Sequence, residues 1–578
     1  MIMYFTPVFS EKCICDFDIC TWWHRDFEIN TKNPVGPHNV RRSRRYNVQV
    51  AKHSTKDFYD SFVYESIPRN GNGRIQNPWD LPHSDTLDPN IDDGISIEEA
   101  EQINLSWSQF VYNRDVDVKI SHVDGISLGP ISNIIIRPSH LVYNVSINEG
   151  SVIIHIPKDD KGHKFSIEFK DDLYSYCSNR FKYVKNGDLV GLEPRNGLLI
   201  FASPPLTRNM VPDMNATNTH VMKPGPINNN DLGSSEIIYF PPGVYWVNQV
   251  DKQDDVYGKY GQNHIKLHPN TYWVYFGAGS YVKGAIEYTT QNKNFYATGF
   301  GVLSGEHYVY QANIQLNYSA VKSDQFSLRM WSHNSIKRGQ MWFCVGPTIS
   351  SPPFNTLDFR PSDSSLTISD YKQVGSYFYQ TNGPQIYSGS VIRDVFYHVN
   401  DDAIKTYYSN VLVERVIVWK CHNDPVVQMG WSWRNISNVT VDSLFVIHTR
   451  YFKSETFVPS AIIGASPFYS PDQKVRPEAS VSVTFSNLIC EGLCPSLVRI
   501  VPLQSYNNLL ILNASFPDGL MRNDIGRSIV SKQKNIKMGI KIMNWFIAGE
   551  KVTMSNFKTD SLGRFDIDSS YWGQWSIN

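Results

Sequence analysis

The chain has no excess of charge of either sign. Its 578 residues include 54 Lys and Arg and 55 Asp and Glu, for a formal net charge of -1. A protein that binds nucleic acid needs a basic face to neutralise phosphates, so nucleic acid is not expected as a partner. Charged residues make up only 19% and aromatic residues 13%, which suits a packed, sheet-rich protein, and flat rings also suit sugar binding.

Long hydrophobic runs are also missing. No stretch approaches the roughly 18 apolar residues of a membrane-spanning helix, so no membrane partner is expected. The first residues, MIMYFTPVFS, are apolar, but they contain neither a basic start nor a small-residue cleavage site. No clear signal peptide is therefore present in this chain.

Several common catalytic motifs are absent. The sequence contains no Walker A loop, no H-E-x-x-H and no glycine fingerprint of a dinucleotide-binding fold. These absences argue against a P-loop nucleotidase, a zinc protease and a dinucleotide-dependent enzyme. Carboxylate chemistry remains as the candidate.

Cysteines are few, but four of the eight form two short local pairs: Cys15 with Cys20, and Cys490 with Cys494. Short loops of this kind close as disulfides in secreted proteins. Zinc binding is the alternative, but neither pair has C-x-x-C spacing. We therefore expect two disulfides and an extracellular protein.

Sequons for N-glycosylation give modest further support for secretion, because an Asn- and Ser-rich chain contains several by chance. The seven sequons begin at Asn104, Asn144, Asn215, Asn317, Asn435, Asn438 and Asn513.

Short strands dominate the pattern along the chain. Residues 40–200 alternate between apolar and polar positions and are broken by turn residues, which predicts a β-sandwich. Residues 205–235 are rich in Pro, Asn and Gly, as in a linker. From residue 236 the strands become shorter and more apolar, end in Asn or Gly, and recur irregularly, about every 20–30 residues. This rhythm favours a parallel β-helix over a second sandwich.

The sequence thus predicts an all-β protein with two domains, as a chain of this length requires. The N-terminal β-sandwich should span residues 1–204, the linker 205–235 and the β-helix 236–578.

One pair of neighbouring carboxylates stands out. Asp401 and Asp402 follow an apolar strand in FYHVNDDAIKTYYS, where two anions repel each other and are unfavourable for folding. Their presence suggests acid/base work or a cation site. The similar pair Asp92 and Asp93 lies in a glycine-bearing turn, PNIDDGIS, and is assigned a turn role.

Stacking of coils predicts what lies beside this pair. On a regular strand Asp401 and Asp402 would face opposite ways, so both can serve one cleft only at the corner of a coil. A residue about one coil earlier lies roughly 4.8 Å away, the spacing of adjacent strands. That residue is Asn382. Groups on neighbouring coils can therefore reach the carboxylate separations that inverting glycosidases use.

Motifs from about Cys15 to the C-terminus resemble those of glycoside hydrolase family 49. They include CTWWH (20–24), FYDSFVYESIPRNGNGRI (58–75), YWVYFGAGSYVKGAIEY (272–288), DYKQVGSYFYQTNGP (370–384), HVNDDAIK (398–405), VWKCHNDPVVQMGW (418–431) and CEGLCPSL (490–497). Within the family the match is closest to the fungal endo-dextranases, and isopullulanase is more distant. The resemblance implies a β-sandwich followed by a right-handed parallel β-helix.

The resemblance also implies catalytic roles. Asp401 resembles the general acid that protonates the leaving oxygen. Asp402 resembles a carboxylate that, together with the aspartate of a Q-T-D-G motif, holds and deprotonates the attacking water. This chain instead reads Gln-Thr-Asn-Gly, with Asn382 in place of that aspartate, and Gln385 stands where relatives have glutamate.

Further candidates for substrate binding lie in motifs next to these coils: Lys405, His422, Asp424 and Trp431, together with Gln385. Each of the first four is alternatively a structural residue at a coil edge. The resemblance implies action on an α-glucan such as dextran without a metal or organic cofactor, and we expect a monomer.

Three functions remain open at this point. The first is a secreted enzyme that hydrolyses internal α-1,6 bonds of dextran with inversion. The second is an α-glucan-binding protein that lost its chemistry with Asn382. The third is an isopullulanase-like hydrolase of a mixed-linkage glucan. If the lost carboxylate was the sole base, activity should fall by about 10²–10⁴-fold, and by less if Asp402 is the base.

Overall fold

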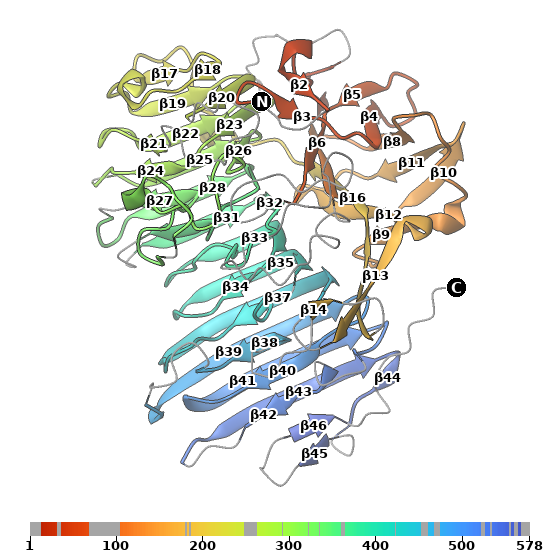
Figure 1. Ribbon diagram of the computed structural model, residues 1–578, viewed down its shortest axis with the longest axis vertical. Helices are drawn as coiled ribbons and strands as arrows, with labels where there is room; N and C mark the ends of the chain where they lie inside the picture. Colours follow the sequence, from red (N-terminus) through yellow and green to blue (C-terminus); the bar gives the residue numbers. More distant parts are fainter. Residues whose placement is uncertain are drawn as a thin grey trace.

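The structure is a computed structural model, and Figure 1 shows its two parts side by side. It describes residues 13–31, 36–68, 104–179, 182–183, 187–247, 263–291, 293–321, 323–333, 336–359, 364–421, 423–451, 460–467, 474–521, 526–531, 535–553, 557–559 and 565–567. No helix within these ranges is long and apolar enough to cross a membrane.

The first part is a sandwich of two main sheets, and strands Tyr46–Lys52 and Val116–His122 of the second sheet bury alternate residues, as the period-2 pattern predicts. The first sheet contains β1 (Ile19–Cys20), β6 (Val63–Ser66), β7 (Asn104–Tyr112), β9 (Ile134–Arg137), β12 (His163–Phe169) and β16 (Asn196–Ser203). The second contains β4 (Tyr46–Lys52), β5 (Tyr59–Ser61), β8 (Val116–His122), β10 (Asn144–Asn148) and β11 (Ser151–Ile156). Smaller sheets are β2 (Ile29–Asn30) with β3 (Val40–Arg41), and β13 (Leu173–Asn179) with β14 (Lys182–Tyr183) and β15 (Asp188–Pro194).

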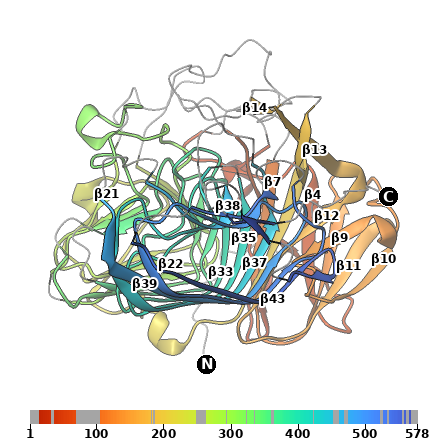
Figure 2. The ribbon, with the colours of Figure 1, turned by 90° about the horizontal axis from the view of Figure 1, so that it is seen from below.

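The second part is a stack of coils whose strands pair in parallel, a β-helix seen nearly end-on in Figure 2. In the early coils one face contains β17 (Thr219–Val221), β19 (Ile237–Phe240), β22 (Trp273–Phe276), β25 (Phe295–Gly299), β28 (Met341–Val345) and β31 (Ser365–Ser369). The next face contains β18 (Gly225–Pro226), β20 (Gly243–Trp246), β23 (Ser280–Lys283), β26 (Val302–Ser304), β29 (Thr348–Ser350) and β32 (Lys372–Val374).

In the later coils these two faces join into single bent strands, because β33 pairs with both β31 and β32. The joined strands are β33 (Val391–Val399), β35 (Val411–Lys420), β37 (Ile436–His448), β39 (Arg476–Cys490), β41 (Gln504–Phe516) and β43 (Met538–Ile547), which pairs with β44 (Glu550–Lys551).

The third face of the β-helix consists of two separate sheets. They are β21 (Ile265–Lys266), β24 (Ile286–Tyr288), β27 (Trp331–His333) and β30 (Leu357–Phe359), and then β34 (Ile404–Lys405), β36 (Val427–Gln428), β38 (Ala461–Ala465), β40 (Ser496–Ile500) and β42 (Ile529–Val530). A hairpin of β45 (Phe557–Thr559) and β46 (Phe565–Ile567) follows.

The only helices within the described ranges are short 3-10 turns. They are η1 (Asp26–Glu28), η2 (Ile131–Asn133), η3 (Lys170–Asp172), η4 (Arg208–Met210), η5 (Asn229–Leu232) and η6 (Ile314–Leu316).

The bends in the long strands have a common backbone cause. Each contains at least one residue with a positive φ: Asp394 in β33, Arg415 in β35, Asn438 and Ser443 in β37, Asn487 in β39, Asn513 in β41 and Asn544 in β43. The side chains of the last three form a ladder at the corner: the Asn544 amide donates to Asn513, and the Asn513 amide donates to Asn487, both at 3.2 Å. Asn tolerates the left-handed conformation better than most residues, which suits it to these corners.

These observations confirm the predicted all-β architecture of a sandwich followed by a parallel β-helix. The parallel sheet begins inside the segment that the sequence suggested as a linker. There, β17 and β18 already pair in parallel with β19 and β20.

A shared apolar cluster joins the two parts. Residues of β7 and β16 pack against β-helix residues, with Trp107 and Phe201 on one side and Phe396 and Trp419 on the other. Polar contacts across the interface join Gly36 to Lys283 (2.9 Å), Gln109 to Thr348 (2.9 Å), Ser66 to Tyr377 (2.9 Å), Glu168 to His448 (2.7 Å) and Arg137 to Glu491 (2.8 Å). The sandwich therefore lies along the side of the β-helix and contacts many of its coils.

Both expected disulfides are present. Cys15 is bonded to Cys20, and Cys490 to Cys494. Among the other cysteines, Cys344 and Cys421 are buried free thiols.

The sequons differ in their access to solvent. Asn104 is only 3% exposed within β7, so its amide cannot accept a glycan in the folded chain. The other six sequon asparagines are exposed.

Candidate active site

The Asp401–Asp402 pair lies at a corner of the β-helix, between the end of β33 and the start of β34. Asn382 precedes it by one coil, and Asp424 follows on the next coil. One carboxylate oxygen from each of Asp401, Asp402 and Asp424 lies within 4.8 Å of the others. The four side chains are between 2% (Asp402) and 6% (Asn382) exposed. Three successive coils therefore contribute to one enclosed cluster.

Asp401 is the hydrogen-bonded centre of the cluster. Its Oδ1 accepts from the Asn382 amide at 3.0 Å and from the backbone N–H of Asp402 at 2.7 Å. Its Oδ2 accepts from the Asn423 amide at 2.9 Å. Three donors therefore favour the ionised form of this carboxylate and fix its orientation.

The carboxylate of Asp402 accepts fewer and longer hydrogen bonds than that of Asp401. Its Oδ1 accepts from the Gln428 amide at 3.4 Å, across the coil boundary. Lys405, on β34, and Lys420, at the end of β35, are both buried and attract both carboxylates. The Nζ of Lys420 also donates to the backbone carbonyl of Asn423.

Burial and mutual repulsion decide where protons reside in this cluster. Burial raises the pKa of Asp401, while the lysines and the hydrogen-bond donors oppose that rise. Burial, and then the charge of Asp401, raise the pKa of Asp402 well above its usual range, and the same causes act on Asp424. Burial lowers the pKa of Lys405 and Lys420. The surroundings therefore act unequally on the pKa values of neighbouring carboxyl groups, as acid/base catalysis requires.

Among the residues that the structure describes, two buried oxygens of the cluster have no hydrogen-bond partner. They are Oδ1 of Asn382 and Oδ1 of Asp424. The backbone of Asp424 has a positive φ of 57°, and its carbonyl accepts from the Tyr451 hydroxyl at 2.8 Å. Since buried polar atoms are normally paired, these two oxygens are available to bind a water molecule or a sugar hydroxyl.

A segment without strands, residues 381–388, brings Asn382 to this position. It lies between the two sheets of the third face: the Gln385 N–H donates to Leu357 O of β30, and the Gly383 N–H donates to Asp402 O. The backbone carbonyl of Asn382 accepts from Thr356 Oγ1 at 3.0 Å and Gln373 Nε2 at 3.1 Å. Neighbouring side chains thus hold the backbone of Asn382 in place.

Gly383→Ala should destabilise the chain. A Cβ at Gly383 would lie 2.2 Å from the carbonyl oxygen of Ala403, so the coil that carries Asn382 would have to move away from the next coil. Overpacking of this kind costs about 1–3 kcal/mol, which urea unfolding measures. Gly36→Ala is the control, because its nearest atoms belong to side chains at 3.2 Å or more. Equal stability of the two variants would mean that the coils have room to separate.

The other sequence candidates occupy different positions. Lys405 and Asp424 belong to the cluster. The amide of Gln385 donates to the neighbouring Ile386 carbonyl at 3.3 Å. Trp431 is half-exposed in the loop after β36, and His422 lies outside the described residues.

Sequence reasoning missed three residues of the cluster: Lys420, Asn423 and Gln428. All three lie in the motif VWKCHNDPVVQMGW, which was noted for other residues. A register argument identifies Lys420, because Lys420 pairs with Val399, just before the carboxylates. The turn that points Asn423 back toward Asp401 leaves no comparable signal in the sequence.

Family models match most parts of the chain. The N-terminal Ig-like domain of glycosyl hydrolase family 49 matches residues 10–205, and the family 49 model itself matches 470–578. An isopullulanase beta-solenoid repeat matches 419–451, and a beta-solenoid repeat from dextranase matches 353–383.

Individual relatives align over nearly the full length. A dextranase of Talaromyces minioluteus is 58% identical over 98% of this chain and 93% of its own. An isopullulanase of Aspergillus niger is 34% identical over 96% of this chain and 94% of its own. The solved structure of Dex49A from Penicillium minioluteum superimposes with a TM-score of 0.89 at 57% identity, over 98% of this chain and 99% of that one. This chain belongs to glycosyl hydrolase family 49.

Proposed function

We propose that the protein is an endo-acting dextranase that hydrolyses internal α-1,6-glucosidic linkages with inversion. The observation that carries the proposal is the meeting of Asn382, Asp401, Asp402 and Asp424 at one corner of three stacked coils. A relative that is 58% identical and named a dextranase supports dextran as the substrate.

In this proposal Asp401 is the general acid and Asp402 is the base that deprotonates the attacking water. Asn382 contributes its free Oδ1, which can accept a hydrogen bond from that water but cannot take its proton. Lys405 and Asp424 are proposed to contact hydroxyl groups of the glucose unit next to the cleaved bond. Asp402 must lose its proton to act as base, which the ammonium groups of Lys405 and Lys420 favour.

Inversion is a separate part of the proposal and rests on the family resemblance. Inverting glycosidases typically separate their carboxyl groups by roughly 6.5–9.5 Å, to leave room for a water molecule. Here the nearest oxygens of Asp401, Asp402 and Asp424 lie within 4.8 Å of one another. The stereochemistry therefore needs a direct measurement, in which NMR identifies the anomer formed first.

A second function is favoured by one specific observation. The amide at Asn382 replaces a carboxylate and donates to Asp401, an arrangement that suits binding of an α-glucan without hydrolysis. The 34% identical isopullulanase supports a third possibility, a substrate with mixed linkages.

Assays of the purified chain on dextran and on pullulan separate these functions. An endo-dextranase should release reducing sugar from dextran and quickly lower its viscosity. Preferential release from pullulan would contradict the choice of substrate. Calorimetric binding of isomaltooligosaccharides without any turnover would overturn the enzymatic proposal and support the glucan-binding one.

A further inference from the structure

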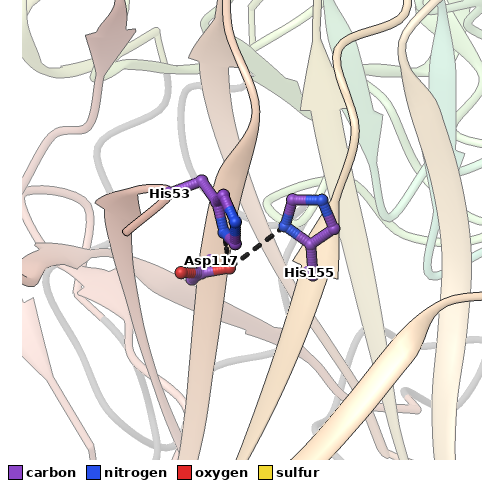
Figure 3. A group of neighbouring side chains, drawn as sticks. All are labelled: His53, Asp117 and His155. Atoms are coloured by element: carbon purple, nitrogen blue, oxygen red, sulfur yellow. Dashed lines mark hydrogen bonds and ion pairs between the residues drawn. The ribbon is translucent and has the colours of Figure 1, made fainter. Parts of the chain in front are cut away.

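A group of metal-ligating side chains lies on the outer face of the sandwich, apart from the carboxylate cluster. His53, Asp117 and His155 converge there, and Figure 3 shows both imidazole rings directed at one carboxylate. The second sheet carries them, whereas the first sheet supplies β7 and β16 to the contact with the β-helix. We propose that these three residues form a binding site for a divalent transition metal of the Zn²⁺ type.

Strand register explains the convergence. Asp117 lies on the central strand β8, where it is directly opposite His155 of β11 and Ala51 of β4. His53 follows β4 and continues the ladder, since its backbone N–H donates to Asp115 O at 3.0 Å. Asp117 and His155 sit at half-exposed positions of strands whose neighbouring residues are buried. Three adjacent segments of a rigid sheet therefore hold the three ligands together.

The distances between the ligand atoms suit a small tetrahedral ion. His53 Nδ1 lies 2.9 Å and His155 Nδ1 lies 3.2 Å from the same atom, Asp117 Oδ1. Ligands bound at about 2.0–2.1 Å to a tetrahedral zinc are about 3.3 Å apart. A metal ion could replace the protons that now join these atoms after shifts of only a few tenths of an ångström.

The two rings are also close to each other, with centroids 4.1 Å apart. One nitrogen of each ring and one oxygen of Asp117 lie within 4.8 Å of one another, as ligands of a single ion must. Imidazole nitrogen with carboxylate oxygen is a ligand set typical of zinc, and the partial exposure of His53 leaves a fourth position for water.

A neighbouring carboxylate supports the required tautomer. When a metal binds Nδ1 of His155, the ring carries its proton on Nε2. Asp115 Oδ2 lies 3.7 Å from that Nε2. Carboxylates beside the distal nitrogen of metal-bound histidines orient the ring and strengthen binding. Asp115 is in turn held by the backbone N–H of Lys158, at 2.9 Å from Oδ1.

Zinc titration of the metal-stripped full chain tests the site. Isothermal calorimetry with ZnCl₂ should show saturable binding of one ion per chain, and bound zinc should raise the unfolding temperature. His155→Ala and His53→Ala should each weaken binding by roughly 10–100-fold or more. Circular dichroism of both variants without metal verifies that they fold.

Two controls locate the bound ion. His268→Ala removes an exposed histidine elsewhere and should leave binding unchanged. Asp402→Asn should also leave it unchanged, because that change alters the buried carboxylate cluster instead. Absence of saturable binding, or binding that survives both His53→Ala and His155→Ala, would overturn the proposal. Loss of dextran hydrolysis would not bear on it, since the two sites are separate.

Discussion

Asn382→Asp should raise the rate of dextran hydrolysis by about 10²-fold or more, if the missing carboxylate limits base catalysis. The change restores a second group that can hold and deprotonate the attacking water, with almost no change in volume. The substituted side chain would stand in the position of the present amide, 3.0 Å from Asp401. Initial rates of reducing-sugar release by the parent and the variant measure the gain.

The same substitution should also move the pH profile. The amide of Asn382 donates to Asp401 and so stabilises its ionised form. A carboxylate in that place removes the donor and adds a like charge, and both changes raise the pKa of Asp401. An acid works only while protonated, so activity is lost as pH rises through its pKa. The alkaline limb of the variant's profile should therefore lie at higher pH than that of the parent.

Asn423→Asp is a matched control for this gain. Its amide donates to the other oxygen of Asp401 at a similar distance, 2.9 Å, so the substitution adds the same charge on the other side. A comparable increase in the rate of dextran hydrolysis by this variant would show that the added charge, and not a carboxylate at position 382, causes the increase. The double variant with Gln385→Glu tests whether the neighbouring amide adapted together with Asn382. No gain in either the single or the double variant, with glucan binding intact, would favour the binding function.

Asp401→Asn should reduce dextran hydrolysis by about 10²–10⁴-fold, because the leaving oxygen would depart unprotonated. A glycoside with a nitrophenol leaving group needs no such proton, so the variant should cleave an α-linked nitrophenyl isomaltooligosaccharide nearly as fast as the parent. Asp402→Asn should lose activity on both substrates, since both need an activated water. Steady-state rates on the two substrates distinguish the roles.

The opposite pattern is also informative. Three donors surround Asp401, while the pKa of Asp402 is raised well above its usual range. If Asp402→Asn still hydrolysed the nitrophenyl substrate and Asp401→Asn did not, Asp402 would be the acid and Asp401 the base.

Local and periodic features were predictable from the sequence. The disulfides close short loops, so proximity along the chain was enough to pair them. The spacing of 19 residues placed Asn382 beside Asp401, because coil stacking converts a sequence interval into one strand spacing. The sequence pattern has strands that end in Asn or Gly, and Asn410, directly before β35, has a positive φ.

Features that depend on loop conformation were not predictable. The interval between coils varies, so no fixed spacing pointed to Asn423 or Gln428. The approach of Asp424 to the carboxylates depends on its left-handed backbone, which its residue type does not require. The sequence did not reveal the first coil of the β-helix, because β17 and β18 are very short and lie among Pro, Asn and Gly. Their strand character comes from pairing with the next coil rather than from local propensity.

The sandwich that lies along the β-helix has a consequence for how the chain unfolds. An isolated solenoid touches only neighbouring repeats, so its coils can open one after another from either end. Here the sandwich contacts coils from Lys283 to Glu491, so opening any of them also breaks contacts with a separately packed body. We therefore expect coils far apart along the axis to unfold in one cooperative transition. Asp401 and Asp402 lie on coils between Lys283 and Glu491, so they belong to that unfolding unit.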